Sequence, residues 1–109
     1  MKEQLEKLSD IMLTYHNTTP PGHVLVDMLK NVTTILFFLE KERAGIHDQW
    51  QSKVHALTKE GSSVSRAENE AHVEYPEMYM LRHIMTAGYR VADAMRSNIS
   101  YLKSEMSHA

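Results

Sequence analysis

The chain has 109 residues, of which 42% are hydrophobic and 24% are charged, and its formal net charge is −2 at pH 7. This length suits one helical domain spanning residues 1–109, and the slightly acidic balance excludes a generally cationic surface for nucleic acid. The absence of cysteine excludes disulfides, thiolate nucleophiles and cysteine zinc sites, and it is typical of proteins from a reducing cytoplasm.

The N-terminus begins with a short amphipathic helix. Leu5, Leu8, Met12 and Tyr15 repeat at a spacing of three, four and three residues, with charged residues between them. The two prolines at 20–21 predict that this helix ends near Tyr15. Residues 1–10 lack the apolar core of a signal peptide, and no later apolar run approaches the ~20 residues needed to span a bilayer. We therefore expect no contact with a membrane.

A second and much longer helix is predicted from about Pro21 to Gly61. Its apolar residues form one stripe, made of Leu25, Leu29, Val32, Leu36, Leu39, Ile46, Trp50 and Leu57. Gly61 provides a stop, and Gly45 is the one place where we expect a kink or a loosened turn. Trp50 is expected in the core.

Residues 35–39 of this helix are apolar on every side. A helix packed against one neighbour needs only one apolar stripe, so this turn must contact at least two neighbours. The first helix and the last helix can supply these contacts, but the far ends of the two long helices would stay thinly covered. We predict a homo-oligomer on this ground.

A short acidic helix is predicted between the two long ones. Ser65 and Glu68 have the spacing of a capping box, which places the helix from Arg66 to about Tyr75. It carries little apolar surface, so we expect it either to fold against the end of the two long helices or to cap a subunit interface.

The last helix is predicted from Pro76 to Met106. Its apolar seam keeps the same three-four spacing over four heptads: Met78, Leu81, Met85, Gly88, Ala92, Met95, Ile99, Leu102 and Met106. The sequence therefore predicts an all-α fold, with a short N-terminal helix, two long antiparallel helices that form a helical hairpin, and a short acidic helix between them, assembled as an oligomeric bundle.

The polar face of this last helix is the candidate ligand-binding face. We assign to it Tyr79, Arg82, Thr86, Tyr89, Arg90, Asp93, Arg96, Ser97 and Lys103. Asp93 lies one turn from both Arg90 and Arg96, so its carboxylate could hold two guanidinium groups in place for an anionic oxygen ligand such as phosphate. The tyrosines offer stacking surfaces for a base.

Two plainer interpretations of the same face stand beside this one. A polar face with arginines and one aspartate is commonly a solvated surface with weak ion pairs. Small hydroxyl side chains also permit close approach of another helix, so a symmetric helix contact is the second alternative. The serines, threonine and tyrosines favour a site, because ordinary solvent-facing helices use Glu and Lys.

No metal site, cofactor or catalytic group is predicted. The histidines form neither an HExxH motif nor the Glu-x-x-His pairs of helical zinc and di-iron sites. No nucleophile triad and no glycine-rich phosphate loop is discernible. We therefore expect a protein that is not an enzyme.

Several short motifs together carry a resemblance that covers most of the chain. They are Tyr15-His16-Asn17, Pro20-Pro21-Gly22-His23, the segment 63–68, and the segment 89–103 with its Tyr-Arg-x-x-Asp-x-x-Arg-Ser pattern. These motifs resemble small all-helical proteins encoded by tailed phages and prophages. The resemblance implies a bacteriophage setting and the cytoplasm of a host bacterial cell. The expected architecture is also similar to that of phage anti-defence sponges, which sequester cyclic nucleotide signals.

The leading functional hypothesis is a phage-encoded binding protein that sequesters an anionic nucleotide between subunits. Two alternatives from other classes remain. One is a helical protein–protein interaction or inhibitor module, which would associate with its partner in a salt-tolerant way. The other is an accessory protein of phage recombination that binds single-stranded DNA, with an affinity that falls steeply with salt; the chain's charge does not favour it.

Overall fold

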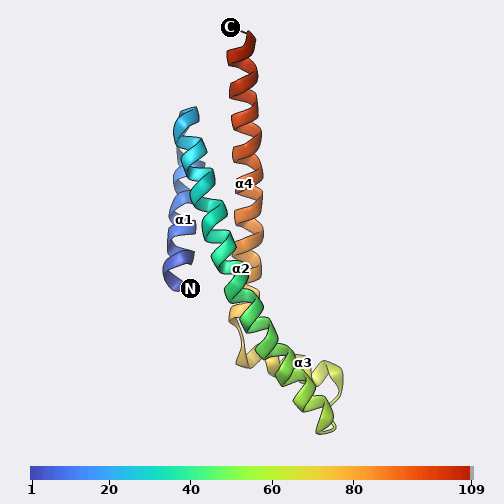
Figure 1. Ribbon diagram of the computed structural model, residues 1–109. Coiled ribbons are helices and arrows are strands. Elements are labelled where there is room, and N and C mark those ends of the chain that lie inside the picture. The colour runs from blue at the N-terminus through green and yellow to red at the C-terminus, as the bar shows by residue number, and fades with distance from the viewer. Residues whose placement is uncertain (109) are drawn as a thin grey trace.

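The computed structural model describes the chain from residue 1 to residue 108, and its side chains from residue 1 to residue 105. It confirms the all-helical fold class (Figure 1). The four helices are α1 (Lys2–Asn17), α2 (Gly22–Lys59), α3 (Val64–Glu74) and α4 (Glu77–His108).

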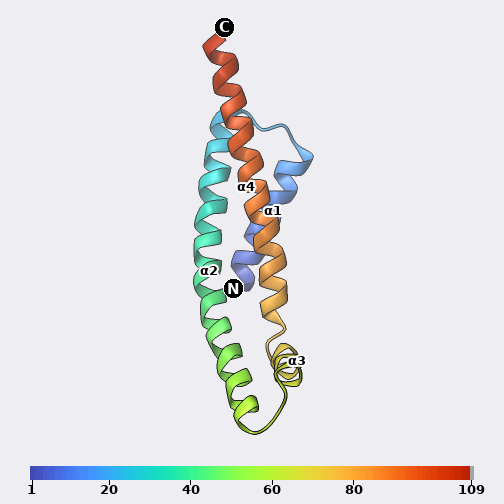
Figure 2. The ribbon, with the colours of Figure 1, turned by 90° about the vertical axis from the view of Figure 1, so that its right-hand side faces the viewer.

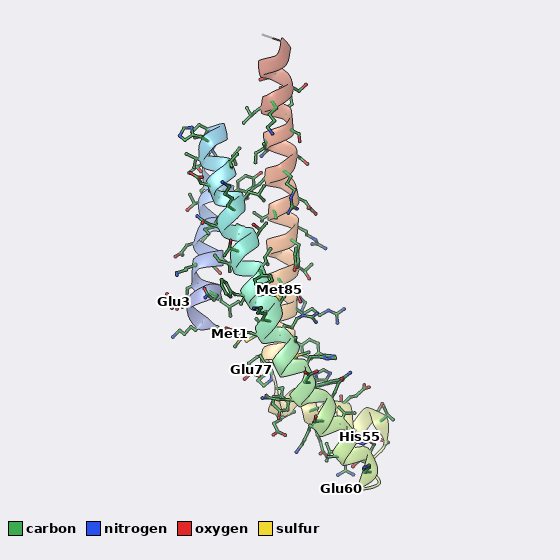
Figure 3. The ribbon with its side chains drawn as sticks, in the orientation of Figure 1. Met1, Glu3, His55, Glu60, Glu77 and Met85 are labelled. Carbon is green, nitrogen blue, oxygen red and sulfur yellow. The ribbon has the colours of Figure 1, made fainter. Side chains whose placement is uncertain are left out.

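The helices form an elongated molecule rather than a compact one (Figures 1 and 2). One end of α2 lies beside α1 and α4, while the other end is covered by α3 alone (Figure 2). Figure 3 shows His55 and Glu60 in this distal part of α2, away from Met1 and Glu3. The terminal amine of Met1 pairs with Glu42 Oε1 at 3.2 Å, which fastens the start of α1 to the middle of α2.

The core lies where α1, α2 and α4 meet. Its buried members are Leu8, Leu25, Met28, Val32, Ile35, Leu36, Leu39, Leu81, Met85, Ala92 and Met95. The predicted seam of the last helix is confirmed from Met78 to Leu102, because these residues are buried or half-buried. The side chain of Met106 lies outside the described residues.

The turn after α2 follows from one glycine. Gly61 has φ of +101°, which side chains with a Cβ adopt only with strain. The amide of Ser62 donates to the carbonyl of Leu57 at 3.1 Å, and the amide of Gly61 donates to that of Thr58 at 3.1 Å. These two bonds define a Schellman motif, so the predicted stop at Gly61 is confirmed with its physical reason.

The cap of α3 differs from the prediction. Ser63, not Ser65, is the N-cap, and its hydroxyl accepts a hydrogen bond from the amide of Arg66 at 3.3 Å. The helix therefore begins at Val64, two residues earlier than expected, and Ser65 lies inside its first turn. Two serines one residue apart offer the chain two caps, and the Schellman turn leads directly into the first. Of the two expected positions for this helix, α3 folds against α2.

The long helix α2 is continuous through Gly45. Its axis curves gently along its length (Figure 2). By length and composition alone this helix is long and apolar enough to cross a membrane, since one 18-residue window has a mean hydropathy of 1.3. The expectation that no stretch of the chain is apolar enough over such a length therefore does not hold for α2. A third of that window is buried inside the molecule, and the core helix of a folded protein meets the same criteria.

The two expected neighbours cover only some residues of the all-apolar turn at 35–39. Ile35, Leu36 and Leu39 are buried between α1 and α4. Phe37 is 58% exposed and Phe38 is 45% exposed, and their rings contact each other edge to face. Two large apolar rings therefore lie on the surface of the single chain.

Candidate functional site

A hollow lined by charged, aromatic and apolar side chains lies where α2, α3 and α4 meet. It has a volume of about 420 Å³. Its lining residues are Arg43, His47, Trp50, Glu68, His72, Met78, Tyr79 and Arg82. We call it the junction hollow. On α2 its residues follow each other at spacings of four and three, and on α3 at a spacing of four, which places each set on one helix face.

A ladder of aromatic rings runs through the junction hollow and joins its three helices. The ring centroids of His47 and Trp50 lie 5.9 Å apart on α2. The ring centroid of Trp50 lies 5.3 Å from that of His72 on α3, and the centroid of His72 lies 4.5 Å from that of Tyr79 on α4. Each such pair contributes about 0.5–1.5 kcal/mol beyond the burial of its area. The ladder therefore helps to hold α3 against the distal part of α2 and to join it to the start of α4.

Two polar atoms of this ladder are buried without a hydrogen-bond partner among the described residues. They are Trp50 Nε1 and His72 Nδ1. A buried polar group that lacks a partner costs about 1–3 kcal/mol. The other ring nitrogen of His72 lies 3.2 Å from the hydroxyl of Tyr79, and the tautomer of His72 decides which of the two atoms donates. The junction is thus rich in hydrogen-bonding capacity that the chain itself does not use.

Two guanidinium groups give the junction hollow its charge. Arg43 lies 3.5 Å from Glu40 and is partly exposed. Arg82 is exposed, and no carboxylate lies within ion-pairing distance of it among the side chains that the structure describes. Glu68 is the one carboxylate in the lining. The arginines therefore outnumber the carboxylate two to one beside a stack of aromatic rings.

The nine residues predicted for the ligand face do not gather at one place. Tyr79 and Arg82 line the junction hollow. The same two residues, with Thr86 and Arg90, line a shallow depression whose walls all come from α4, so it is a space between neighbouring side chains of one helix. This depression adjoins the junction hollow through the shared pair.

Tyr89 and Arg96 lie instead in a groove between α2 and α4. The hydroxyl of Tyr89 donates to Glu40 Oε1 at 3.1 Å. Burial and this hydrogen bond to the carboxylate raise the pKa of Tyr89. Asp93 holds Arg96 at 2.9 Å, and within the described part of the chain it has no ion pair with Arg90. The prediction that one carboxylate holds both arginines is therefore wrong.

Ser97 and Lys103 lie farther along α4 and are exposed. Lys103 lies 24 positions after Tyr79, which is about 36 Å along the helix at 1.5 Å per residue. A single small ligand therefore cannot touch both ends of the predicted face.

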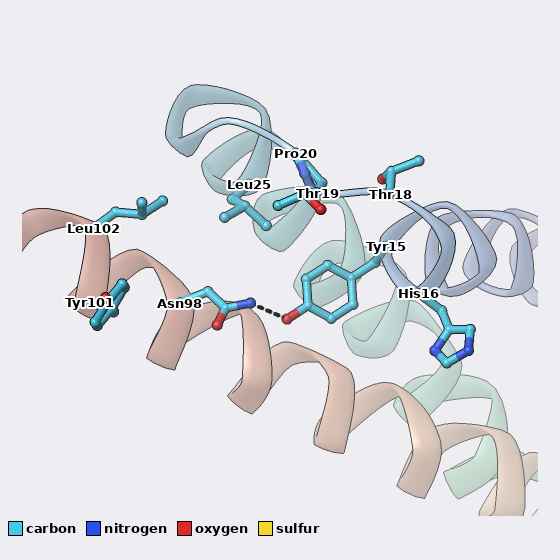
Figure 4. Close-up of a pocket in the computed structure, with 9 residues that line it drawn as sticks. All are labelled: Tyr15, His16, Thr18, Thr19, Pro20, Leu25, Asn98, Tyr101 and Leu102. Atoms are coloured by element: carbon cyan, nitrogen blue, oxygen red, sulfur yellow. Dashed lines mark hydrogen bonds between the residues drawn. The ribbon is translucent and has the colours of Figure 1, made fainter.

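A further hollow of about 420 Å³ lies between the end of α1 and α4 (Figure 4). It is bridged by a hydrogen bond from the amide of Asn98 to the hydroxyl of Tyr15. Its lining includes His16 but no Lys, Arg, Asp or Glu. It therefore lacks the charge that an anionic ligand requires.

Sequence reasoning missed His47, His72 and Arg43 as site residues and assigned Trp50 to the core. Trp50 is half-buried and lies outside the main core. Its spacing from His47 and Arg43 was a visible signal, because the three share one face of α2. The sequence did not indicate that His72 of α3 would face them.

No protein-family model, no curated protein and no solved structure matches this chain. Among the described residues, no group of three or more His, Asp or Glu side chains is placed to hold a metal ion.

Proposed function

We propose that this chain is a non-enzymatic helical binding protein that takes up an anionic nucleotide in the junction hollow. One observation carries the proposal: the aromatic ladder ends at Tyr79, whose ring is about half exposed, in a hollow also lined by Arg43 and Arg82. A nucleotide combines a flat base with phosphate. Aromatic rings stack on bases, and the guanidinium fork binds phosphate oxygens through two parallel hydrogen bonds.

The size and polarity of the junction hollow support a small ligand. Its volume of about 420 Å³ falls in the range of small-molecule pockets. Trp50 Nε1 and His72 Nδ1 are buried without partners, and both residues line the hollow. The indole N–H can donate to a ligand's acceptor atom, and His72 Nδ1 can donate or accept according to its tautomer. Pairing them would recover about 1–3 kcal/mol for each group.

The resemblance to small helical phage proteins supports a biological setting for this proposal. A phage protein that sequesters a signal nucleotide of its host needs tight binding and no chemical step. The chain would then act in the cytoplasm of the host bacterial cell as an anti-defence sponge.

The single tryptophan of the chain provides the test, because Trp50 lines the proposed site. We would titrate the protein with mono-, di- and cyclic nucleotides and follow Trp50 fluorescence. At least one nucleotide is expected to change the fluorescence saturably. Arg82→Ala should weaken that binding by about tenfold or more, the effect of losing a charged hydrogen bond.

The matched control is Arg96→Ala, which removes an exposed arginine from the same helix but from a different groove. Its nucleotide affinity should stay near that of the unmodified chain, and circular dichroism should show unchanged helicity for both variants. Absence of a saturable response to the whole panel, or equal weakening in both variants, would refute the proposal. A protein partner would then become the better hypothesis.

A further inference from the structure

The chain exposes more surface than a compact protein of its size. Its accessible surface is 7510 Å², whereas a compact monomer of 12.6 kDa exposes about 6,200 Å². Its radius of gyration is 18.9 Å, against about 13 Å for a compact chain of this length. The excess of about 1,300 Å² exceeds the roughly 800 Å² that each partner buries in a standard protein interface.

Part of this surface is an open groove between α2 and α4. It is lined by Thr33, Leu36, Phe37, Glu40, Tyr89, Ala92 and Arg96. No residue of α1 lines this open groove. The residues of α2 that face α1, which include Ile35 and Phe38, lie on another side of α2. The packed pair of α2 and α4 is thus covered by α1 on one side only.

The open groove has an apolar floor and large apolar walls. Leu36 and Ala92 are buried at its base. Phe37 is 58% exposed and Tyr89 is 44% exposed at its rim. The ammonium of Lys41 lies 4.8 Å from the centre of the Phe37 ring and is the only cation–π cover of this ring among the described residues.

The charges at the open groove suit a copy of the same surface. Glu40 of α2 and Arg96 of α4 carry opposite charges and both line it. In a twofold contact each residue of one copy meets the same surface on the other, so Arg96 of one copy can approach Glu40 of its partner. A surface that carries both signs and an apolar centre is therefore complementary to itself.

We infer that a second copy of this chain docks on the open groove and forms a twofold homodimer. Phe37 of each copy packs between α2 and α4 of the other, and the contact takes up most of the excess surface. The open groove and the junction hollow share no lining residue, although Glu40 of the groove pairs with Arg43 of the hollow. The dimer is therefore tested by mass and not by nucleotide binding.

The test compares two apolar residues of equal exposure. Phe37→Glu places a charge in the open groove, and Leu13→Glu places the same charge on α1, where the leucine is 59% exposed. Analytical ultracentrifugation of the unmodified chain should give twice the mass of 12.6 kDa. Phe37→Glu should give the monomer mass with unchanged helicity, and Leu13→Glu should remain dimeric.

A second variant in the open groove tests whether a loss of the dimer in Phe37→Glu comes from misfolding. Thr33→Arg introduces a long cationic side chain one turn before Phe37 and should also give the monomer. The inference is overturned if the unmodified chain is monomeric, if both groove variants remain dimeric, or if only Leu13→Glu dissociates. If the chain is monomeric and co-floats with phospholipid vesicles, the exposed face of α2 binds a membrane instead. That result would also overturn the inference of a homodimer.

Discussion

Tyr79 and His72 join α4 to α3 by two contacts at once: the Tyr79 hydroxyl lies 3.2 Å from His72 Nε2, and the two ring centroids are 4.5 Å apart. Because the ring of His72 also contacts that of Trp50 on α2, this pair completes a connection through three helices. The position of the short helix α3 therefore depends on aromatic contacts more than on a hydrophobic core, since only Ala67 and Ala71 of α3 are buried.

Removing parts of this connection should lower stability in steps. Tyr79→Phe keeps the ring and loses the hydroxyl, so the free energy of unfolding should fall by about 0.5–1.5 kcal/mol, the net value of one hydrogen bond. His72→Ala also removes two ring contacts and should cost about 1–3 kcal/mol more. Urea unfolding followed by circular dichroism measures both changes.

The control for these variants is Tyr101→Phe. The Tyr101 hydroxyl donates to Glu105 within one exposed turn of α4, at 2.8 Å. Its loss should change the free energy of unfolding by less than about 0.5 kcal/mol, as is usual for surface substitutions. Equal losses in Tyr101→Phe and Tyr79→Phe would show that the Tyr79 contact contributes nothing beyond a surface hydrogen bond.

The pair of Tyr89 and Glu40 predicts a loss of stability at alkaline pH. Burial and the hydrogen bond to Glu40 raise the pKa of Tyr89 above its usual 10.0. The unfolded chain therefore loses this proton first, and its contribution to stability is complete below pH 10 and is lost as the pH rises through the folded pKa. Urea unfolding from about pH 8 to about pH 11 should show this decline, and Tyr89→Phe should make it shallower.

The pKa of Lys53 is also raised, so the contribution of Lys53 to the alkaline loss of stability needs its own control. Its hydrogen bond to Glu74 and the charge of that carboxylate raise the pKa of Lys53 above 10.5. The stability that it contributes is therefore also lost as the pH rises through its folded pKa. The double variant Tyr89→Phe with Lys53→Gln should have a shallower decline than either single variant. An unchanged decline in Tyr89→Phe would contradict the raised pKa of Tyr89.

Two glycines in long helices should respond differently to alanine. A Cβ at Gly45 would meet no atom within 4 Å, so Gly45→Ala should raise the free energy of unfolding by about 0.5–1 kcal/mol through helix propensity. A Cβ at Gly88 would lie 3.0 Å from Leu36 Cδ2 and 3.3 Å from Leu8 Cδ2, in the buried core.

Because those leucine side chains are tightly surrounded, overpacking should offset the gain in propensity at Gly88. We expect Gly88→Ala to be less stable than Gly45→Ala by about 1 kcal/mol or more, measured by urea unfolding. A Gly88→Ala variant that matches or exceeds Gly45→Ala would show that the Leu36 and Leu8 side chains can shift away from α4 at little cost.

The helices could be predicted because apolar spacing and helix signals are local properties of the sequence. The stripe from Leu81 to Met95 predicts which face of α4 is buried, and Gly61 predicts where α2 ends. The start of α3 was missed because the choice between Ser63 and Ser65 depends on the geometry of the preceding turn. A spacing rule that compares the two serines alone cannot make that choice.

The candidate site could be predicted only in part, because periodicity assigns a residue to a face and does not say what the face meets. Tyr79 and Arg82 were found from α4 alone. Their neighbours His72 and Trp50 come from two other helices, and the contact depends on how two turns place α3. The bond between Tyr89 and Glu40 joins residues 49 positions apart and could not be read from either helix.

The main core extends along α2 only as far as Ile46 and along α4 only from Leu81 onward. Beyond these residues, α3 and the distal part of α2 have little buried apolar surface to resist local opening, so their amides should exchange with solvent sooner than those of the core. The junction hollow thus lies at the edge of the main core, where the molecule has less buried apolar surface. A ligand bound there must use part of its binding energy to order the hollow, and it should slow amide exchange in α3.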